Sequence, residues 1–259
     1  MVQFKPPKAL FSEESPERLP TEHDLPDTDG RPVDNELQLL IPILLRGVLE
    51  MAWSDRQDWF FGANMGVYYE PKQPAVGPDG FLCLGVPHYR EGKDLRLSYV
   101  VWQEKVMPIW VLEIVSQKPG KEYGEKMKLY AELGILYYTI YNPKYQKREG
   151  HQTLEVYRLI EGEYVLQSGQ PVWMPEVGLG IGRTRGKEGH LPTREWLYFY
   201  DENGHQYPTK DLVIARQNEQ IKQESERADR AEQVAEQERQ RLEDLVQKLR
   251  DRNIDPDTL

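Results

Sequence analysis

The stretch Met107–Gly134, MPIWVLEIVSQKPGKEYGEKMKLYAELG, carries the pattern that indicates the fold class of this chain. It opens with an apolar run from Ile109 to Val115 that contains a single acid, Glu113. Such a run is typical of a β-strand covered on both faces. An ionised carboxylate in such a strand is unfavourable unless a cation or a proton compensates it. Glu113 is therefore either a metal ligand or the partner of a lysine, with Lys126 and Lys118 as candidates.

The remainder of this stretch predicts a crossover between two strands. Tyr123 to Leu133 has the pattern of a short amphipathic helix, and Gly134 is its expected C-cap. Ile135 to Tyr141 is rich in β-branched and aromatic residues and ends at Asn142-Pro143, which predicts a second strand. The order strand, helix, strand predicts a right-handed parallel βαβ unit.

An amphipathic helix is expected to begin near Glu36, with Asp34 or Asn35 as its N-cap. Its apolar residues recur at steps of three and four: Leu37, Leu40, Ile41, Leu44, Leu45, Val48, Leu49 and Trp53. Glu36 has two interpretations. It is an acid favoured by the helix dipole, or it is an outer ligand of a metal or of its water.

Several further strands complete the predicted sheet. Their patterns cover Asp58–Tyr69, Phe81–Leu84, Leu95–Trp102, Leu154–Leu159, Tyr164–Leu166 and Glu195–Tyr200. The first of these contains a glycine break. Pro78-Asp79-Gly80 precedes one of them and by itself indicates a turn. Val177–Gly182 carries three glycines without the G-x-G-x-x-G spacing, which favours a turn-rich connection over a dinucleotide site.

Composition narrows the classes of function. The formal net charge of -10 argues against broad, non-specific binding of nucleic acid, although a locally basic groove beside an acidic metal site is compatible with it. One cysteine, Cys83, excludes an internal disulfide and a four-cysteine zinc cluster, which favours a reducing cytoplasm. The sequence shows neither a signal-peptide pattern nor an apolar run long enough for a membrane span.

Four segments follow from these patterns. We expect a flexible acidic segment over residues 1–30, an α/β domain over 31–210, a helical or coiled-coil tail over 211–250 and a flexible end over 251–259. In the tail, apolar residues recur every seven positions: Ile214, Ile221, Ala228, Ala235, Leu242 and Leu249. The residues three or four positions after each of these are mostly polar. The pattern therefore fits both a weak coiled coil and a solvated helix, and it does not decide whether the tail self-associates.

Asp79 and Glu113 together suggest a metal site. Mg²⁺ prefers hard oxygen ligands and often takes one or two carboxylates together with waters and substrate oxygens. An acid at the start of one strand and an acid inside a neighbouring strand can meet at one edge of the sheet. A nearby lysine can orient the attacking water and offset developing negative charge.

The chain resembles the Uma2 family, in the form common in cyanobacteria. The resemblance rests on Pro78-Asp79-Gly80, on Val111–Ser116 (VLEIVS), on Lys126 four residues before Tyr130, and on the sequence LYYTIYNP. It extends over about Val33 to Tyr200. It implies a restriction-endonuclease-like fold of the PD-(D/E)xK type, in which a mixed β-sheet is flanked by helices.

The resemblance also implies a site and an activity. Asp79, Glu113 and the main-chain carbonyl of Ile114 would bind Mg²⁺, Glu36 resembles the helix acid that completes such sites, and DNA would be the substrate. The motif would place lysine at position 115, where this chain has Val115. Lys126 is then the best candidate for a lysine that has moved to the following helix, and Lys128 is the second.

Two functional hypotheses result. The first is a cytoplasmic, Mg²⁺-dependent endonuclease in which Lys126 positions the attacking water. The second is a catalytically impaired protein of the same fold that binds or assembles through its C-terminal helix.

Overall fold

The structure is a computed structural model that describes residues 18–26, 35–117 and 121–251. The expected flexible ends, 1–30 and 251–259, lie for the most part outside these residues, as do Asp34 and Lys118. The chain divides into two compact units, Met1–Thr209 and Lys210–Leu259. Each unit is described by itself.

Helix α1 (Glu36–Ala52) forms as its apolar spacing predicts. The Asn35 side chain caps it by accepting a hydrogen bond from the Leu37 N–H at 3.0 Å. Pro42 lies inside the helix and has no N–H to donate to the carbonyl of Gln38. The Asn64 side-chain amide donates to that carbonyl instead, at 2.9 Å. The helix therefore continues through a proline because a residue from outside supplies the missing donor.

Six strands of the described residues form the main sheet, in the order β1-β3-β5-β6-β7-β8. Their bounds are β1 Trp59–Ala63, β3 Gly80–Leu84, β5 Trp110–Ile114, β6 Tyr137–Tyr141, β7 Leu154–Ile160 and β8 Glu163–Leu166. β5 and β6 run parallel, and the other neighbouring pairs are antiparallel. The sheet is mixed, which confirms the fold class expected from the sequence.

The predicted crossover joins the two parallel strands. Helix α3 (Glu125–Glu132) connects β5 to β6, and Leu133 is its C-cap. Gly134, the expected cap, follows in the left-handed conformation with φ 72°. Glycine is the residue that adopts this conformation with least strain at a helix end. A short helix, α4 (Gln146–Glu149), lies between β6 and β7.

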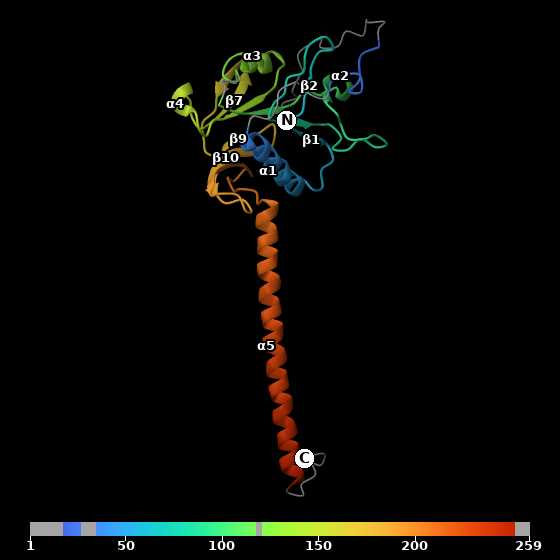
Figure 1. Cartoon of the computed structure of the whole chain (residues 1–259), viewed down its shortest axis with the longest axis vertical. Helices are drawn as coiled ribbons and strands as arrows, with labels where there is room; N and C mark the ends of the chain where they lie inside the picture. Colours follow the sequence, from blue (N-terminus) through green and yellow to red (C-terminus); the bar gives the residue numbers. More distant parts are fainter. Residues whose placement is uncertain (1–17, 27–34, 118–120, 252–259) are drawn as a thin grey trace. The chain divides into compact units, whose positions relative to one another are not determined.

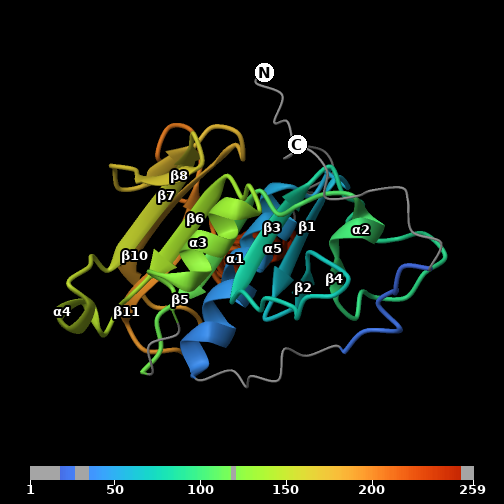
Figure 2. The ribbon, with the colours of Figure 1, turned by 90° about the horizontal axis from the view of Figure 1, so that it is seen from above.

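The two faces of the sheet carry different layers (Figure 2). On one face, Trp110, Leu112 and Ile114 pack in a core shared with α1. On the other, Val111 and Val115 pack in a core with residues of α3 and its C-terminus. Alternation along β5 thus directs Glu113 to the same face as Val111 and Val115, beneath α3.

A second sheet of three described strands completes the α1 side. It has the order β11-β10-β9, with β9 Val172–Met174, β10 Leu179–Gly186 and β11 Arg194–Tyr200. The turn expected at Val177–Gly182 is confirmed at Val177 and Gly178. The rest of that range belongs to β10, where Gly180 and Gly182 pair with Tyr200 and Tyr198. A Cβ at Gly182 would lie 3.0 Å from Pro171 and Tyr200, so close packing explains that glycine.

Asp58–Tyr69 divides into β1 and β2 (Val67–Tyr68), as its glycine break predicts, and Asn64 between them has φ 47°. Another expected strand differs from the sequence prediction. Leu95–Trp102 is not one strand: only β4 (Tyr99–Val100) pairs, with β2, and helix α2 (Val101–Glu104) follows. The β-branched and aromatic residues of this segment favour a strand. In the structure, two of them pair with β2 in a separate two-stranded sheet, and the residues that follow form α2.

Helix α5 (Lys210–Arg250) forms one continuous run of 41 residues (Figure 1). It has no buried residue, and Ile214, Ile221 and Leu242 of the heptad row are exposed. Across the residues that the structure describes, no helix has the length and apolar character needed to span a membrane.

Candidate functional site

The two acids singled out in the sequence lie on adjacent strands of the main sheet. Gly80 of β3 pairs with Leu112 of β5 in antiparallel register. Continued by one residue, that register sets Asp79 opposite Glu113, and directly opposed residues project from the same face with Cβ atoms about 5 Å apart. The two acids therefore project from the same face of the sheet at its edge.

Glu113 is buried, with 2% of its surface exposed, and its two carboxylate oxygens have different partners. Lys126 Nζ donates to Oε2 at 2.7 Å, and the hydroxyl of Tyr130 donates to Oε1 at 2.6 Å. Both partners lie on α3, one helical turn apart, which places them on one face of the helix. Burial raises the pKa of Glu113, although both hydrogen bonds oppose that change.

Asp79 is buried directly before β3, and among the described residues no cation pairs with it as Lys126 pairs with Glu113. Its Oδ2 accepts a hydrogen bond from the Ile114 N–H at 2.6 Å. Burial and the adjacent charge of Glu113 raise the pKa of Asp79 well above its ordinary range. The charged form of Asp79 is therefore less well compensated than that of Glu113.

Lys126 differs from the other lysines near the site. Its side chain is 18% exposed, and Nζ also approaches the carbonyl of Gly77 at 3.5 Å. Burial opposes its charge, but Glu113 and Asp79 outweigh that effect and raise its pKa. Lys128, the second candidate, is 80% exposed and pairs with Glu132 at 3.8 Å. Lys121 is exposed and pairs with Glu125.

A polar scaffold that the sequence analysis missed holds the site from the α1 side. Gln38 donates to the Ile114 carbonyl at 3.3 Å and also contributes a hydrogen bond to the Asp79 carboxyl. Asn64 donates its backbone N–H to the Asp79 carbonyl at 3.0 Å and its side-chain amide to the Gln38 carbonyl. These contacts fix both the acid and the carbonyl proposed as ligands.

The signals for this scaffold were weak in the sequence. Gln38 stands on the polar side of an amphipathic helix, where a solvated residue is the usual expectation. Asn64 before Met65-Gly66 suggests only a turn. The spacing of Tyr130 from Lys126 is visible in the sequence, but the hydrogen bond from its hydroxyl to Glu113 is not.

Glu36 and Val115 occupy the two positions that remain from the expected site. Glu36 is exposed in the first turn of α1, and among the described residues no hydrogen bond or ion pair links it to Asp79 or Glu113. Val115 is buried in the apolar core beneath α3. Position 115 thus contributes packing, and Lys126 supplies the cation nearest to Glu113.

The donor set is compatible with a divalent cation. Within 18–26, 35–117 and 121–251, no three His, Cys, Asp or Glu side chains gather at ligand spacing. Two carboxylates and a main-chain carbonyl, completed by waters, nevertheless match the usual coordination of Mg²⁺. Two buried acids whose charges repel each other are also favourable for a cation, because it would displace the proton that the pair otherwise retains.

A family match covers the part of the chain that carries these residues. The sequence profile of the Uma2 family, described as "Putative restriction endonuclease", matches residues 30–185, which include Asp79, Glu113 and Lys126. No curated protein matches the chain. The match covers more than half of the chain, and membership of this family indicates a nuclease. The chain belongs to the Uma2 family of restriction-endonuclease-like proteins.

Proposed function

We propose that this protein is an Mg²⁺-dependent endonuclease that hydrolyses phosphodiester bonds in DNA at the Asp79–Glu113 site. The observation that supports it most strongly is the buried acid pair with one lysine, Lys126, contacting Glu113 at 2.7 Å. Glu113, Asp79 and the carbonyl of Ile114 would hold the cation. When bound, Mg²⁺ supplies a water of lowered pKa and neutralises charge on the phosphate.

The chain's own residues define the remaining roles. Lys126 keeps its proton at neutral pH, since its pKa is raised. It is therefore suited to hydrogen bonding and charge compensation rather than to removing a proton from water. Tyr130 holds Glu113 in one orientation. Gln38 orients the Ile114 carbonyl. Glu36, exposed at the start of α1, would contribute through water.

Replacement of Glu113 by glutamine tests this proposal. Changing even an outer partner of a metal ligand typically costs 10- to 100-fold in activity, so loss of a ligand should reduce plasmid cleavage with Mg²⁺ by at least about 100-fold. Glu132→Gln is the matched control, because Glu132 is an exposed acid on the same helix. Cleavage by Glu113→Gln at the wild-type rate would refute the assignment.

A second function has its own support. Val115 stands where the PD-(D/E)xK lysine is expected, and α5 exposes apolar residues at heptad spacing. Both fit a catalytically impaired protein of this fold that assembles through α5. Light scattering on the full chain and on a chain ending at Thr209 distinguishes the two cases. If the protein assembles through α5, the full chain should contain more protomers per particle than the truncated chain. Equal numbers of protomers in the two would remove the role of α5.

A further inference from the structure

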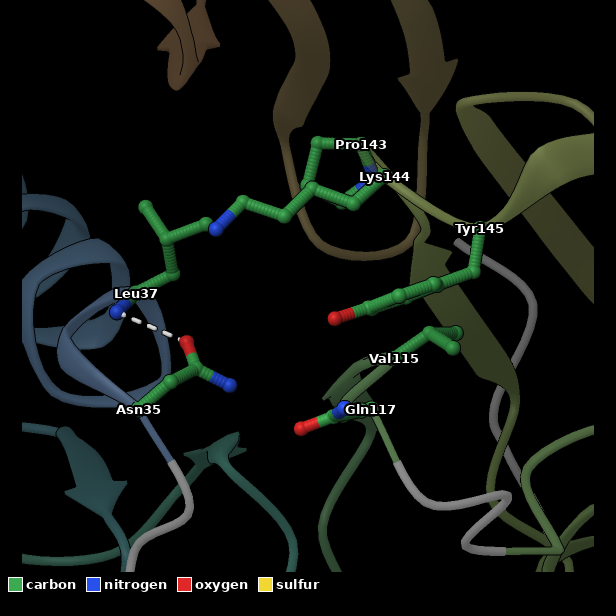
Figure 3. A pocket seen from close by; sticks show the side chains of 7 residues that line it. All are labelled: Asn35, Leu37, Val115, Gln117, Pro143, Lys144 and Tyr145. Atoms are coloured by element: carbon green, nitrogen blue, oxygen red, sulfur yellow. Dashed lines mark hydrogen bonds between the residues drawn. The ribbon is translucent and has the colours of Figure 1, made fainter.

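A pocket of about 420 Å³ lies beside the acid pair, and its residues come from three elements (Figure 3). Asn35 and Leu37 come from the start of α1. Val115 and Gln117 follow β5, and Lys144 and Tyr145 follow β6 with Pro143. The carboxyl ends of neighbouring parallel strands are where open α/β sheets characteristically bind ligands.

The lining has an unusual charge for this protein. The full chain has a formal net charge of -10, yet the described residues that line the pocket include one cation, Lys144, and no acid. Glu36 lies between two of them in sequence but does not line the pocket. A ligand that carries negative charge is therefore favoured over a cationic one.

The chemistry of the lining also indicates a planar polar group. Asn35 uses its side-chain oxygen to cap α1 and one amide hydrogen to contact Gln38, which leaves one donor and one acceptor position on that amide. Gln117 also presents an amide to the pocket, and amides of this kind read the edge of a base. Tyr145 offers an aromatic ring, and Leu37 and Val115 provide apolar walls. Figure 3 shows the Tyr145 ring extending, hydroxyl foremost, into the space between Lys144 and the Asn35 and Gln117 amides.

The turn that carries Tyr145 is fixed from below. Asn142, which is fully buried, accepts a hydrogen bond from the Tyr145 N–H at 2.9 Å through its side-chain oxygen. The Asn142 N–H donates to the Thr153 carbonyl at 2.7 Å. The aromatic ring thus stands on a hydrogen-bonded support at the end of β6.

The pocket is connected to the acid pair by two hydrogen bonds. Asn35 donates to the Gln38 side chain at 3.3 Å, and Gln38 donates to the Ile114 carbonyl at 3.3 Å. Val115 is two strand residues beyond Glu113, a separation of roughly 7 Å. The pocket is a separate hollow that adjoins the acids, within reach of a nucleotide next to a phosphate held there.

We propose that this pocket takes one unpaired nucleotide of the strand whose phosphate lies at Asp79 and Glu113, so that the protein prefers DNA with unpaired bases. A base inside a duplex cannot enter such a pocket unless it is flipped out, which costs unpairing energy. In this complex the base stacks on Tyr145, the amides of Asn35 and Gln117 contact its edge, and Lys144 contacts a phosphate. The inference rests on the proposed function for its position, while the pocket's binding is independent of cleavage.

Binding without metal tests it on the full chain. The probes are a fluorescein-labelled 20-mer of mixed sequence and the same strand in a duplex, measured by anisotropy in EDTA, where no Mg²⁺-dependent cleavage occurs. We expect tighter binding of the single strand. Tyr145→Ala should weaken that binding roughly 5- to 100-fold, the range for losing one stacked base, and change duplex binding less than about twofold. Lys144→Ala should lower the salt slope by about 1.

Matched controls and a wild-type measurement keep the test independent of folding. Tyr89→Ala and Lys128→Ala remove an exposed tyrosine and an exposed lysine, and both should bind like wild type. On the wild-type chain, deoxyadenosine monophosphate should compete with the single strand, and inorganic phosphate at the same concentration should not. Equal competition by phosphate, equal affinity for the duplex, or unchanged binding by a folded Tyr145→Ala would each overturn the inference.

The outcome separates this inference from the proposed function. A chain that prefers the single strand through Tyr145 but cleaves no DNA with Mg²⁺ keeps the pocket assignment and loses the nuclease assignment. A chain whose cleavage depends on Glu113 but whose binding ignores Tyr145 keeps the nuclease assignment and loses the pocket.

Discussion

Two glutamates in this chain have nearly the same partner geometry and opposite titration behaviour. Glu113 in the sheet has Lys126 at 2.7 Å, and Glu236 in helix α5 has Arg239 at 2.8 Å. Glu113 is 2% exposed and its pKa is raised, whereas the side chain of Glu236 is 44% exposed and its pKa is lowered. At Glu236 the hydrogen bonds from Arg239 and Gln240 dominate, because water still solvates the carboxylate. At Glu113 desolvation dominates.

The difference shows where ion pairs matter in this molecule. Exposed pairs along a helix contribute little and are screened by salt. A buried carboxylate keeps its charge only through its partners, and removal of one of them leaves the other charge poorly compensated. We therefore expect charge substitutions to have large effects in the Asp79–Glu113 region and small effects in α5.

The largest effect on stability is expected for Lys126→Met, which keeps much of the apolar stem and removes the charge. It should lower the free energy of unfolding by about 3 kcal/mol, near the low end for a broken buried pair, because Glu113 can take up a proton. Cleavage should fall about 100-fold or more, because a charge that stabilises the transition state is lost. Urea titration and plasmid cleavage provide the measurements.

Two control variants, one at a lysine and one at an arginine, sharpen this prediction. Lys128→Met changes an exposed lysine on the same helix, and Arg239→Met changes the partner of Glu236. Neither should measurably alter the unfolding of the Met1–Thr209 unit or the rate of cleavage. If Lys126→Met behaved like either control, the distinction between the two regions would be lost.

An intermediate effect, dependent on pH, is expected for Asp79→Asn without metal. The pKa of Asp79 is raised from its ordinary value of 3.8, so between that value and the folded pKa the native state binds more protons than the unfolded state. Wild-type stability should therefore fall as pH rises through this window. The variant lacks that contribution, so its stability relative to wild type should increase from pH 4 to pH 8.

Melting curves in EDTA from pH 4 to pH 8 measure this difference, and curves with Mg²⁺ extend it. By mass action, Mg²⁺ at a hundredfold excess over Kd should raise the free energy of unfolding of the wild type by about 2.7 kcal/mol, and with it the melting temperature. It should not raise that of Asp79→Asn. A constant difference between the two proteins across pH would contradict the raised pKa.

The smallest effects are expected at the start of α1. Gln38→Ala removes the hydrogen bond to the Ile114 carbonyl and should cost about 1 kcal/mol of stability, with cleavage reduced roughly tenfold. Glu36→Ala removes an exposed side chain and should change stability by less than about 0.5 kcal/mol. Plasmid cleavage measures both variants. A larger loss of cleavage in Glu36→Ala than in Gln38→Ala would contradict this ranking and make Glu36 the α1 residue on which catalysis depends more.

The sequence predicted the elements whose burial follows a simple period. The apolar spacing of α1, the run of β5 and the aromatic strand β6 each identify their element, because one covered face repeats at the helical or strand period. The prediction was wrong at Leu95–Trp102 and over Leu179–Gly182. There, pairing with strands distant in the sequence decided the structure, and local composition carries no information on such pairing.

By itself, the sequence determined that an acid lies in a buried strand, that a lysine-bearing helix follows it, and that position 115 is a valine. Only the tertiary structure decided which groups meet. In the structure, Lys126 and Tyr130 both donate to the carboxylate of Glu113. The α1 residue that contacts the Ile114 carbonyl is Gln38, whereas the sequence had pointed to Glu36 on that helix. A pocket lies beside the acids. The reason is physical: period and composition specify which face an element buries, whereas a hydrogen bond depends on the register between elements that sequence spacing does not specify.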